Sequence, residues 1–188
     1  MKALEAAGIY LIVDLGSGTA SINRANPTYT IDLFNSYKAR VDAFAKYNNL
    51  LGFIGSNEII NEAGNVTKSA PYAKALVRDI KLYLSGFNRK IPVGYAAADV
   101  AEVRVQAFNY FTCGDSAAAV DFFGENLYSW CGDSSFTTSG YSDRTNEIKN
   151  SNIPVIITEY GCNQPSPRKF TEVRFIFINF PFFFGIFF

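Results

Sequence analysis

The chain has 188 residues with 17 basic and 17 acidic side chains, so no net charge draws it to nucleic acid or to an anionic membrane. This balance fits a neutral polymer best. Histidine is absent, which removes the usual metal ligand and the usual base of a catalytic triad. We therefore expect carboxylates, tyrosines or cysteines to carry any chemistry, without a metal or another cofactor.

The first predicted elements are the end of a helix and a buried strand. Residues Met1 to Gly8 have the pattern of a last helical turn closed by glycine, and they lack the apolar stretch of a signal peptide. The β-branched run from Ile9 to Leu15 predicts a parallel strand that is covered on both faces and ends at Asp14. We therefore expect the chain to begin in the middle of a fold.

A second buried strand follows the first long predicted helix. Apolar side chains recur at helical spacing from Ile31 to Tyr47, with charges on the opposite face. The apolar stretch from Leu51 to Glu58 has the length of a strand and ends in an amide and a carboxylate, Asn57 and Glu58. Polar groups in this place are typical of barrel enzymes, whose active sites lie at the carboxyl ends of the strands.

Helices and strands alternate through the rest of the chain. The remaining predicted helices cover residues 72–84, 103–111 and 143–149, and the remaining predicted strands lie within residues 91–96, 121–130 and 153–161. The last of these strands ends, like the second, on a glutamate, Glu159.

Five buried strands separated by helices predict either a barrel or an open doubly wound sheet. Acidic residues close three of the five, Asp14, Glu58 and Glu159, which favours the barrel. The Gly16-Ser-Gly turn does not continue into a glycine-rich phosphate fingerprint, which weakens the nucleotide-binding alternative. Because a complete barrel needs roughly 250 residues, we predict an incomplete α/β fold, a (β/α)8 TIM barrel with about five central strands.

The two strand-end glutamates suggest a chemistry. A retaining glycoside-cleaving enzyme needs two carboxyl groups, one as general acid/base and one as nucleophile, and Glu58 and Glu159 would supply them. Strand-end carboxylates also cap neighbouring helices, so neither glutamate is specific by itself.

The cysteines and one asparagine indicate a secreted protein. Cys113, Cys131 and Cys162 lack the close spacing of a zinc site or a redox motif, so a disulfide is the better interpretation. The odd number leaves one thiol that is either free or paired outside the chain. Asn65-Val-Thr67 is a glycosylation sequon in a segment that we expect to be a polar loop between helices.

The end of the chain differs from the rest. Eight of its last fourteen residues are phenylalanine, from residue 175 onward. This stretch is shorter than the roughly 20 residues of a spanning helix, and it lacks the polar spacer of a lipid-anchor signal. We predict two parts, a partial glycoside hydrolase barrel over residues 1–173 and an aberrant phenylalanine-rich tail over residues 174–188.

Seven segments together resemble a known family, the fungal β-1,3-glucanosyltransferases of glycoside hydrolase family 72. They follow the order of the family over residues 1–173, and as a set they are far more specific than any one of them. The segments are Ala7-Gly-Ile-Tyr-Leu-Ile-Val-Asp-Leu, Ser21-Ile-Asn-Arg, Gly55-Ser-Asn-Glu, Lys90-Ile-Pro-Val-Gly-Tyr, Tyr128-Ser-Trp-Cys-Gly-Asp-Ser, Thr138-Ser-Gly-Tyr and Thr158-Glu-Tyr-Gly-Cys-Asn.

The resemblance implies a role for each candidate residue. Glu58 would be the acid/base and Glu159 the nucleophile, and Cys131 would form a disulfide with Cys162, leaving Cys113 to pair beyond the end of this chain. The donor side of the cleft would hold Asp14, Gly16, Ser17, Asn23 and Arg24. Asn57 would assist Glu58, Tyr141 would line the cleft, and the acceptor would contact Asp99 and Arg104.

Several of these residues keep a second interpretation. Aspartates beside turns, such as Asp14 and Asp99, accept hydrogen bonds from backbone N–H groups by default. Arg104 could equally be a solvated charge or the ion-pair partner of Asp99 or Glu102. Trp130 suits either a platform for sugar stacking or a packed position beside a disulfide.

The predicted function is elongation of β-1,3-glucan by a retaining double displacement, with glucan chains as donor and acceptor and no nucleic acid partner. The alternatives are a β-1,3-glucan hydrolase and an inactive or weakly glucan-binding fragment, because the resemblance implies that the first and last barrel strands are missing. It also implies a glycoprotein at the cell surface, held at the plasma membrane by a GPI anchor whose signals are absent from this chain.

Overall fold

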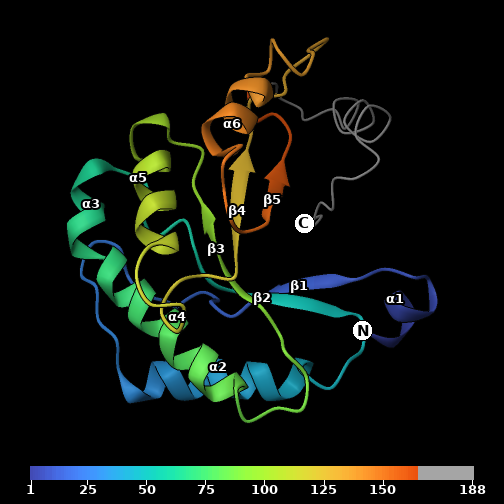
Figure 1. Ribbon diagram of the computed structural model, residues 1–188, viewed down its shortest axis with the longest axis vertical. Helices are drawn as coiled ribbons and strands as arrows, with labels where there is room; N and C mark the ends of the chain where they lie inside the picture. Colours follow the sequence, from blue (N-terminus) through green and yellow to red (C-terminus); the bar gives the residue numbers. More distant parts are fainter. Residues whose placement is uncertain (165–188) are drawn as a thin grey trace.

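Figure 1 shows the computed structural model of the chain, which describes residues 1–164 except for the side chains of residues 65–67. All five predicted strands are present, with ends within three residues of the prediction. The elements in chain order are α1 (Lys2–Ala6), β1 (Leu11–Asp14), α2 (Ile31–Phe44), β2 (Leu50–Asn57), α3 (Ala63–Lys68), α4 (Ala70–Leu84), β3 (Val93–Ala97), α5 (Ala101–Thr112), β4 (Phe122–Leu127), α6 (Tyr141–Ile148) and β5 (Val155–Tyr160).

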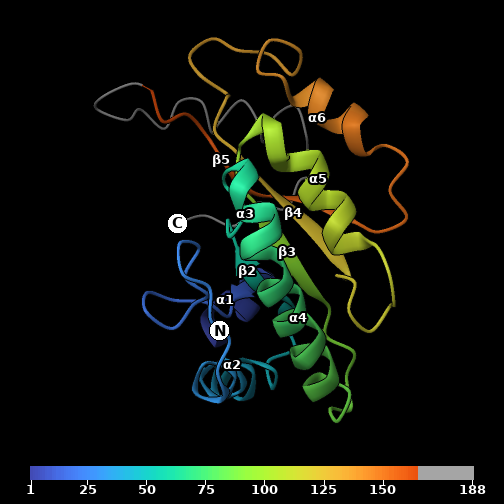
Figure 2. The ribbon, with the colours of Figure 1, turned by 90° about the vertical axis from the view of Figure 1, so that its left-hand side faces the viewer.

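The five strands form one parallel sheet in the order β1-β2-β3-β4-β5. A doubly wound sheet reverses its strand order and carries helices on both faces, whereas a barrel keeps sequential order with its helices outside. Figures 1 and 2 show α4 and α5 on the same face of the sheet. This arrangement confirms the predicted partial (β/α)8 barrel.

The main core lies between the sheet and these helices. The buried face of α4 contributes Leu76, Val77 and Ile80, none of which is exposed. They pack with strand residues such as Phe53 and Val93, which are also fully buried. Burying a side chain of this size contributes about 1.5 to 3 kcal/mol relative to leaving it in water, so this layer stabilises the fold substantially.

A second, smaller cluster lies on the opposite face, which corresponds to the barrel interior. It contains Phe122, because strand residues alternate between faces and its neighbour Phe123 belongs to the helix-side core. A Cβ on Gly94 would lie 2.4 Å from the Phe122 ring, and one on Gly52 would lie 3.2 Å from it. Glycine at these two positions therefore makes room for the aromatic ring inside the sheet.

One predicted loop is a helix. α3 covers residues that we expected to form a polar loop, so the backbone of Asn65 lies in a short helix, while its side chain is outside the described part. The local sequence Gly64-Asn-Val-Thr67 has weak helical preference, and packing against α4 and α5 stabilises the helix. The predicted boundary at residue 173 and the phenylalanine-rich tail lie beyond the described residues. Over residues 1–164, every helix is too short or too polar to cross a membrane.

Candidate active site

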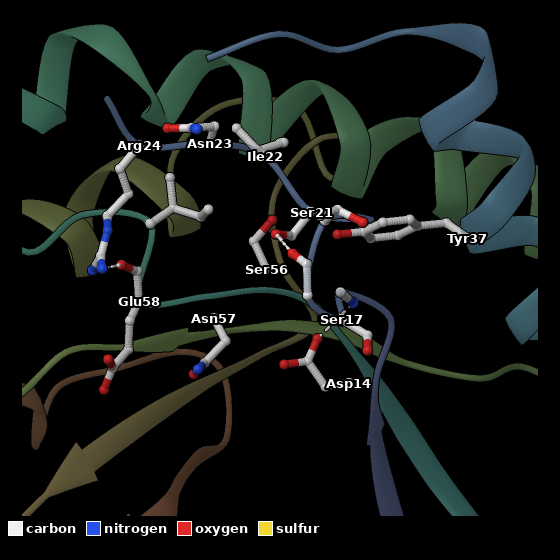
Figure 3. Close-up of a pocket in the computed structure, with 14 residues that line it drawn as sticks. Asp14, Ser17, Ser21, Ile22, Asn23, Arg24, Tyr37, Ser56, Asn57 and Glu58 are labelled. Atoms are coloured by element: carbon white, nitrogen blue, oxygen red, sulfur yellow. Dashed lines mark hydrogen bonds between the residues drawn. The ribbon is translucent and has the colours of Figure 1, made fainter. Parts of the chain in front are cut away.

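A polar pocket of about 730 Å³ opens at the carboxyl ends of β1 and β2 (Figure 3). Glu58 and Asn57 line it from the end of β2. All five residues predicted for the donor side also line it, namely Asp14, Gly16, Ser17, Asn23 and Arg24. Hydroxyl, amide and carboxyl groups of this kind suit a ligand with many hydroxyl groups.

Glu58 has an unusual backbone conformation. Its φ of 49° makes it the one non-glycine residue with positive φ in the described part of the chain. This left-handed conformation costs roughly 1 to 2 kcal/mol for a residue with a side chain, and such strain concentrates at functional sites. Two contacts hold it: the Glu58 N–H donates to the Ala96 carbonyl at 2.9 Å, and Arg24 donates to the Glu58 carbonyl at 3.1 Å.

Asn126 of β4 fixes the side chains at the end of β2, a role that the sequence analysis missed. Its Nδ2 donates to Glu58 Oε1 at 2.8 Å and to Asn57 Oδ1 at 3.1 Å. Its own Oδ1 accepts from the Thr158 hydroxyl at 2.8 Å. Asn126 is completely buried, so its amide is held in place and orients the Glu58 carboxyl group. The sequence signal was available, since Glu125-Asn126 interrupts the apolar run of a buried strand.

Glycine at position 124 allows the contact between Thr158 and Asn126. A Cβ on Gly124 would lie 2.7 Å from Thr158 Cγ2 and 2.8 Å from Thr158 Oγ1. Glycine at this position therefore lets β5 bring Thr158 close to β4. The hydrogen bonds from Thr158 to Asn126 and from Asn126 to Glu58 then link the ends of β5, β4 and β2.

Glu159 lies on the same rim, near the end of β5. In the sheet ladder its Cα is the partner of Asn126, the residue that contacts Glu58. Tyr128, just beyond β4, donates a hydrogen bond from its hydroxyl to Glu159 Oε2. The two predicted catalytic carboxyl groups are therefore gathered around the end of β4. Their catalytic roles stay predictions at this point.

Tyr141 does not line this cleft. It is the first residue of α6, and Gly140 at φ 79° precedes it and turns the chain inward. Its side chain is 1% exposed, and its hydroxyl donates to the Leu127 carbonyl at 3.0 Å. The tyrosine that contacts a predicted catalytic carboxylate is Tyr128, and its place directly after a buried strand was the signal.

Trp130 is a core residue. It is 1% exposed and packs edge-on against Tyr141 with 5.2 Å between ring centroids. An indole so covered has no free face on which a sugar could stack. Trp130 therefore has the packed position beside the disulfide rather than the role of a sugar-stacking platform. Its neighbour Cys131 forms the disulfide.

Arg104 is buried behind the sheet. Its side chain is 3% exposed and is not among the residues that line this pocket, and its contact with an acceptor stays a prediction. It pairs with Asp99 at 3.4 Å and with Glu147 at 3.0 Å. The partner interpretation is therefore confirmed for Asp99, whereas the second partner is Glu147 of α6 rather than Glu102. Asp99 also lies outside the pocket, and its carboxylate accepts from the Tyr128 N–H at 2.9 Å.

The carboxyl group of Asp14 has a raised pKa. Its Oδ1 accepts a hydrogen bond from the Gly16 N–H at 2.7 Å, as expected of an aspartate beside a turn. Burial nevertheless raises its pKa from 3.8 to about 6, opposed by that bond and by Arg40, while the charge of Glu159 adds to the rise. A Cβ on Gly16 would lie 2.9 Å from the Tyr37 hydroxyl, so glycine keeps this side of the pocket open.

The predicted Cys131–Cys162 disulfide is present, with 5.0 Å between the Cα atoms. It joins positions 31 residues apart, and constraining a loop of this length contributes roughly 3 to 4 kcal/mol. It ties the segment after β4 to the segment after β5, next to Tyr128 and Glu159. Cys113 is free and exposed. Within residues 1–164, no cluster of three or more His, Cys, Asp or Glu side chains could hold a metal ion.

Comparisons with known proteins agree with this geometry. Residues 1–180 match the model of the glucanosyltransferase family, glycoside hydrolase family 72. The chain is 48% identical over 178 residues to Protein EPD1 of Candida maltosa, covering 94% of this chain and 32% of that protein. It is 46% identical over 180 residues to 1,3-beta-glucanosyltransferase GAS2 of Saccharomyces cerevisiae, covering 95% of this chain and 32% of that protein.

Solved structures show the same fold. Saccharomyces cerevisiae Gas2p in complex with laminaritriose and laminaritetraose matches with a TM-score of 0.85 and 45% identity, over 94% of this chain and 40% of that one. The chain thus spans about a third of the length of the curated relatives that it matches. The match at this identity, over nearly all of the chain, places it in the glucanosyltransferase family of glycoside hydrolase family 72.

Proposed function

We propose that the protein to which this chain belongs is a retaining β-1,3-glucanosyltransferase. The observation that carries the proposal is that Glu58 and Glu159 both contact the carboxyl end of β4. Asn126 donates a hydrogen bond to Glu58, and Tyr128, just beyond the strand, donates one to Glu159. A retaining enzyme needs two carboxyl groups on opposite sides of one glycosidic bond. The laminari-oligosaccharides in the Gas2p complex support a β-1,3-glucan as the substrate.

In the first step, a carboxylate oxygen of Glu159 attacks the anomeric carbon of the donor glucan. The glycosidic bond breaks, and the leaving oxygen takes the proton of the Glu58 carboxyl group. The products are a glycosyl ester on Glu159 and a released glucan with a new hydroxyl group. In the second step, Glu58 removes the proton from an acceptor hydroxyl, whose oxygen attacks the anomeric carbon and frees Glu159.

The neighbouring residues give each carboxyl group a defined orientation. Asn126 holds Glu58 Oε1, which fixes the face that Glu58 presents to the leaving oxygen. The same Nδ2 group of Asn126 also donates a hydrogen bond to Asn57 Oδ1. The Nδ2 group of Asn57 is therefore the part of this side chain that can donate to a sugar hydroxyl group. Tyr128 holds Glu159 Oε2, which leaves Oε1 as the attacking atom.

The deciding experiment follows the products of a reduced laminari-oligosaccharide. A transferase gives both longer and shorter products, a hydrolase gives only shorter ones, and an inactive fragment gives neither. Glu58→Gln and Glu159→Gln should each abolish the longer products, because each removes one carboxyl group of the pair. Glu62→Gln is the matched control, since Glu62 is an exposed carboxylate four residues from Glu58. Production of only shorter products by the wild-type chain would replace this proposal with hydrolysis.

We also propose a cell-surface location for the whole protein, with a GPI anchor outside this chain and glycosylation at Asn65. The support is the family, the sequon, and a disulfide, which persists in oxidising compartments and is rare in the cytosol. Removal of N-glycans should increase the gel mobility of the native protein, and Asn65→Gln should make that increase smaller. Release from membranes by a phospholipase that cleaves GPI anchors would test the anchor. A protein that stays in the cytosolic fraction would refute the location.

A further inference from the structure

Asp99 contacts the strand that carries the site, although it does not line the pocket. Its Oδ2 accepts the hydrogen bond of the Tyr128 backbone N–H at 2.9 Å. The hydroxyl group of the same tyrosine donates to Glu159 Oε2. Tyr128 is therefore held at its backbone by one acid and reaches the predicted nucleophile with its side chain.

Asp99 is itself held from behind the sheet. Arg104 Nη1 lies 3.4 Å from Asp99 Oδ1, and Arg104 Nε lies 3.0 Å from Glu147 Oε2. With its side chain 3% exposed, Arg104 has little water to compensate its charge, so these carboxylates are needed to neutralise it. The planar guanidinium group also fixes their relative orientation better than an ammonium group would. Asp99 thus has one strongly favoured position.

The other side of Tyr128 is anchored to β5. The Gly161 N–H donates to the Leu127 carbonyl, and the Trp130 N–H donates to the Gly161 carbonyl, both at 3.1 Å. The Cys131–Cys162 disulfide closes the same junction. The segment from Leu127 to Cys131 is therefore fastened toward β5, and Asp99 fastens it on the side of β3.

We propose that Asp99, oriented by Arg104, is a positioning residue for the first step of the transfer: it sets Tyr128 so that the tyrosine hydroxyl aims Glu159 at the anomeric carbon. The inference rests on the proposed function. A misplacement of about 1 Å at a reacting group can cost roughly 100-fold in rate. This role differs from the acceptor contact expected from the sequence, because an acceptor takes part only in the second step.

The first step can be measured alone with a 2-deoxy-2-fluoro-β-laminaribiosyl fluoride, which forms the ester on Glu159 and releases fluoride without an acceptor. Asp99→Ala should lower the rate constant of labelling roughly 10- to 100-fold, with little change in the inhibitor concentration at half-saturation. Asp99→Asn keeps an oxygen that accepts from the Tyr128 N–H and should label within a few-fold of wild type. Glu102→Ala removes an exposed carboxylate from the first turn of α5 and serves as the control. Wild-type labelling by Asp99→Ala, with only a raised acceptor KM, would overturn the inference.

A double-mutant cycle tests whether Asp99 acts through the tyrosine. Tyr128→Phe should slow labelling, and adding Asp99→Ala to it should slow labelling little further. If the fold-reduction in labelling rate of the double variant equalled the product of those of the two single variants, Asp99 would act independently of Tyr128, and the inference would be overturned.

A measurement that does not need activity separates this inference from the proposed function. In the chain labelled with fluorotyrosine, the Tyr128 resonance is assigned by its loss in Tyr128→Phe, and it should shift in Glu159→Gln and in Asp99→Ala. An unmoved resonance in Asp99→Ala would refute the positioning role. Shifted resonances in a wild-type chain that forms no ester would support the positioning role and count against the proposed function alone.

Discussion

Replacing Glu125 with glutamine should make the protein more stable at neutral pH. Glu125 is a carboxyl group of β4 that is 2% exposed and faces away from the cleft. Burial raises its pKa from 4.5 to about 7; Arg104 opposes the rise, and Glu147 and then Asp99 add to it. The folded state therefore binds this proton more tightly than the unfolded state does.

The sign and size of the effect follow from linkage. Because the pKa is raised on folding, the stabilising contribution is complete below pH 4.5 and is lost as the pH rises through about 7. The difference of 7 − 4.5, or about 2.5 units, corresponds to about 3 kcal/mol at 1.36 kcal/mol per unit. Glutamine has nearly the same shape but no such proton. Its gain over wild type should be near zero at pH 4 and approach about 3 kcal/mol at pH 8.

The assay is urea unfolding at several pH values, followed by the fluorescence of the single tryptophan, Trp130, which is buried in the folded state. Asp14 also titrates in this range, but it does so in both proteins and cancels in their difference. Asp14→Asn is a matched control, since it should remove the contribution of Asp14 to the pH dependence of stability and leave that of Glu125 in place. Equal pH dependence in wild type and Glu125→Gln, or a variant less stable than wild type at pH 8, would contradict this reasoning.

Three further changes probe the site, the interior and the disulfide. Asn126→Ala removes a hydrogen bond to the Glu58 carboxyl group, so kcat for glucan transfer should fall roughly 10- to 100-fold. An unchanged kcat would show that other contacts orient Glu58. Gly94→Ala places a Cβ 2.4 Å from the Phe122 ring and should lower the free energy of unfolding by about 1 to 3 kcal/mol in urea titrations, with recovery when Phe122→Leu is added. Failure of that second change to restore stability would mean that the clash lies elsewhere. Cys162→Ser should cost roughly 3 to 4 kcal/mol by the same measurement, and reduction of the wild type should match it.

The overall architecture was predictable because burial leaves a periodic pattern in the chain. Buried parallel strands appear as continuous apolar runs, and the helices between them keep a 3.6-residue stripe. Both Glu58 and Glu159 stand out because each ends such a run. α3 was missed because its residues have weak helical preference and are held by contacts with α4 and α5.

The errors within the site come from information that a linear pattern does not contain. Tyr141 and Tyr128 both lie near polar segments, and only the start of α6 decides which of them turns into the core. For Arg104 the sequence left a solvated charge and an ion-pair partner as alternatives, and two carboxylates allow it to be buried as an ion-pair partner. Long-range partners of this kind, such as Glu147 from another helix, are invisible until the helices are placed.

Two adjacent side chains of strand β4, those of Glu125 and Asn126, point to opposite faces of the sheet and have different roles. Glu125 points to the helices, where burial controls its proton, while Asn126 points to the cleft, where its amide contacts Glu58. An amide is required at position 126, because it must donate to Glu58 and also accept from Thr158. A carboxylate there would accept from Thr158 but repel Glu58. The neutral residue thus lies beside the two predicted catalytic glutamates, and the ionisable one lies behind the sheet, where its titration acts on stability.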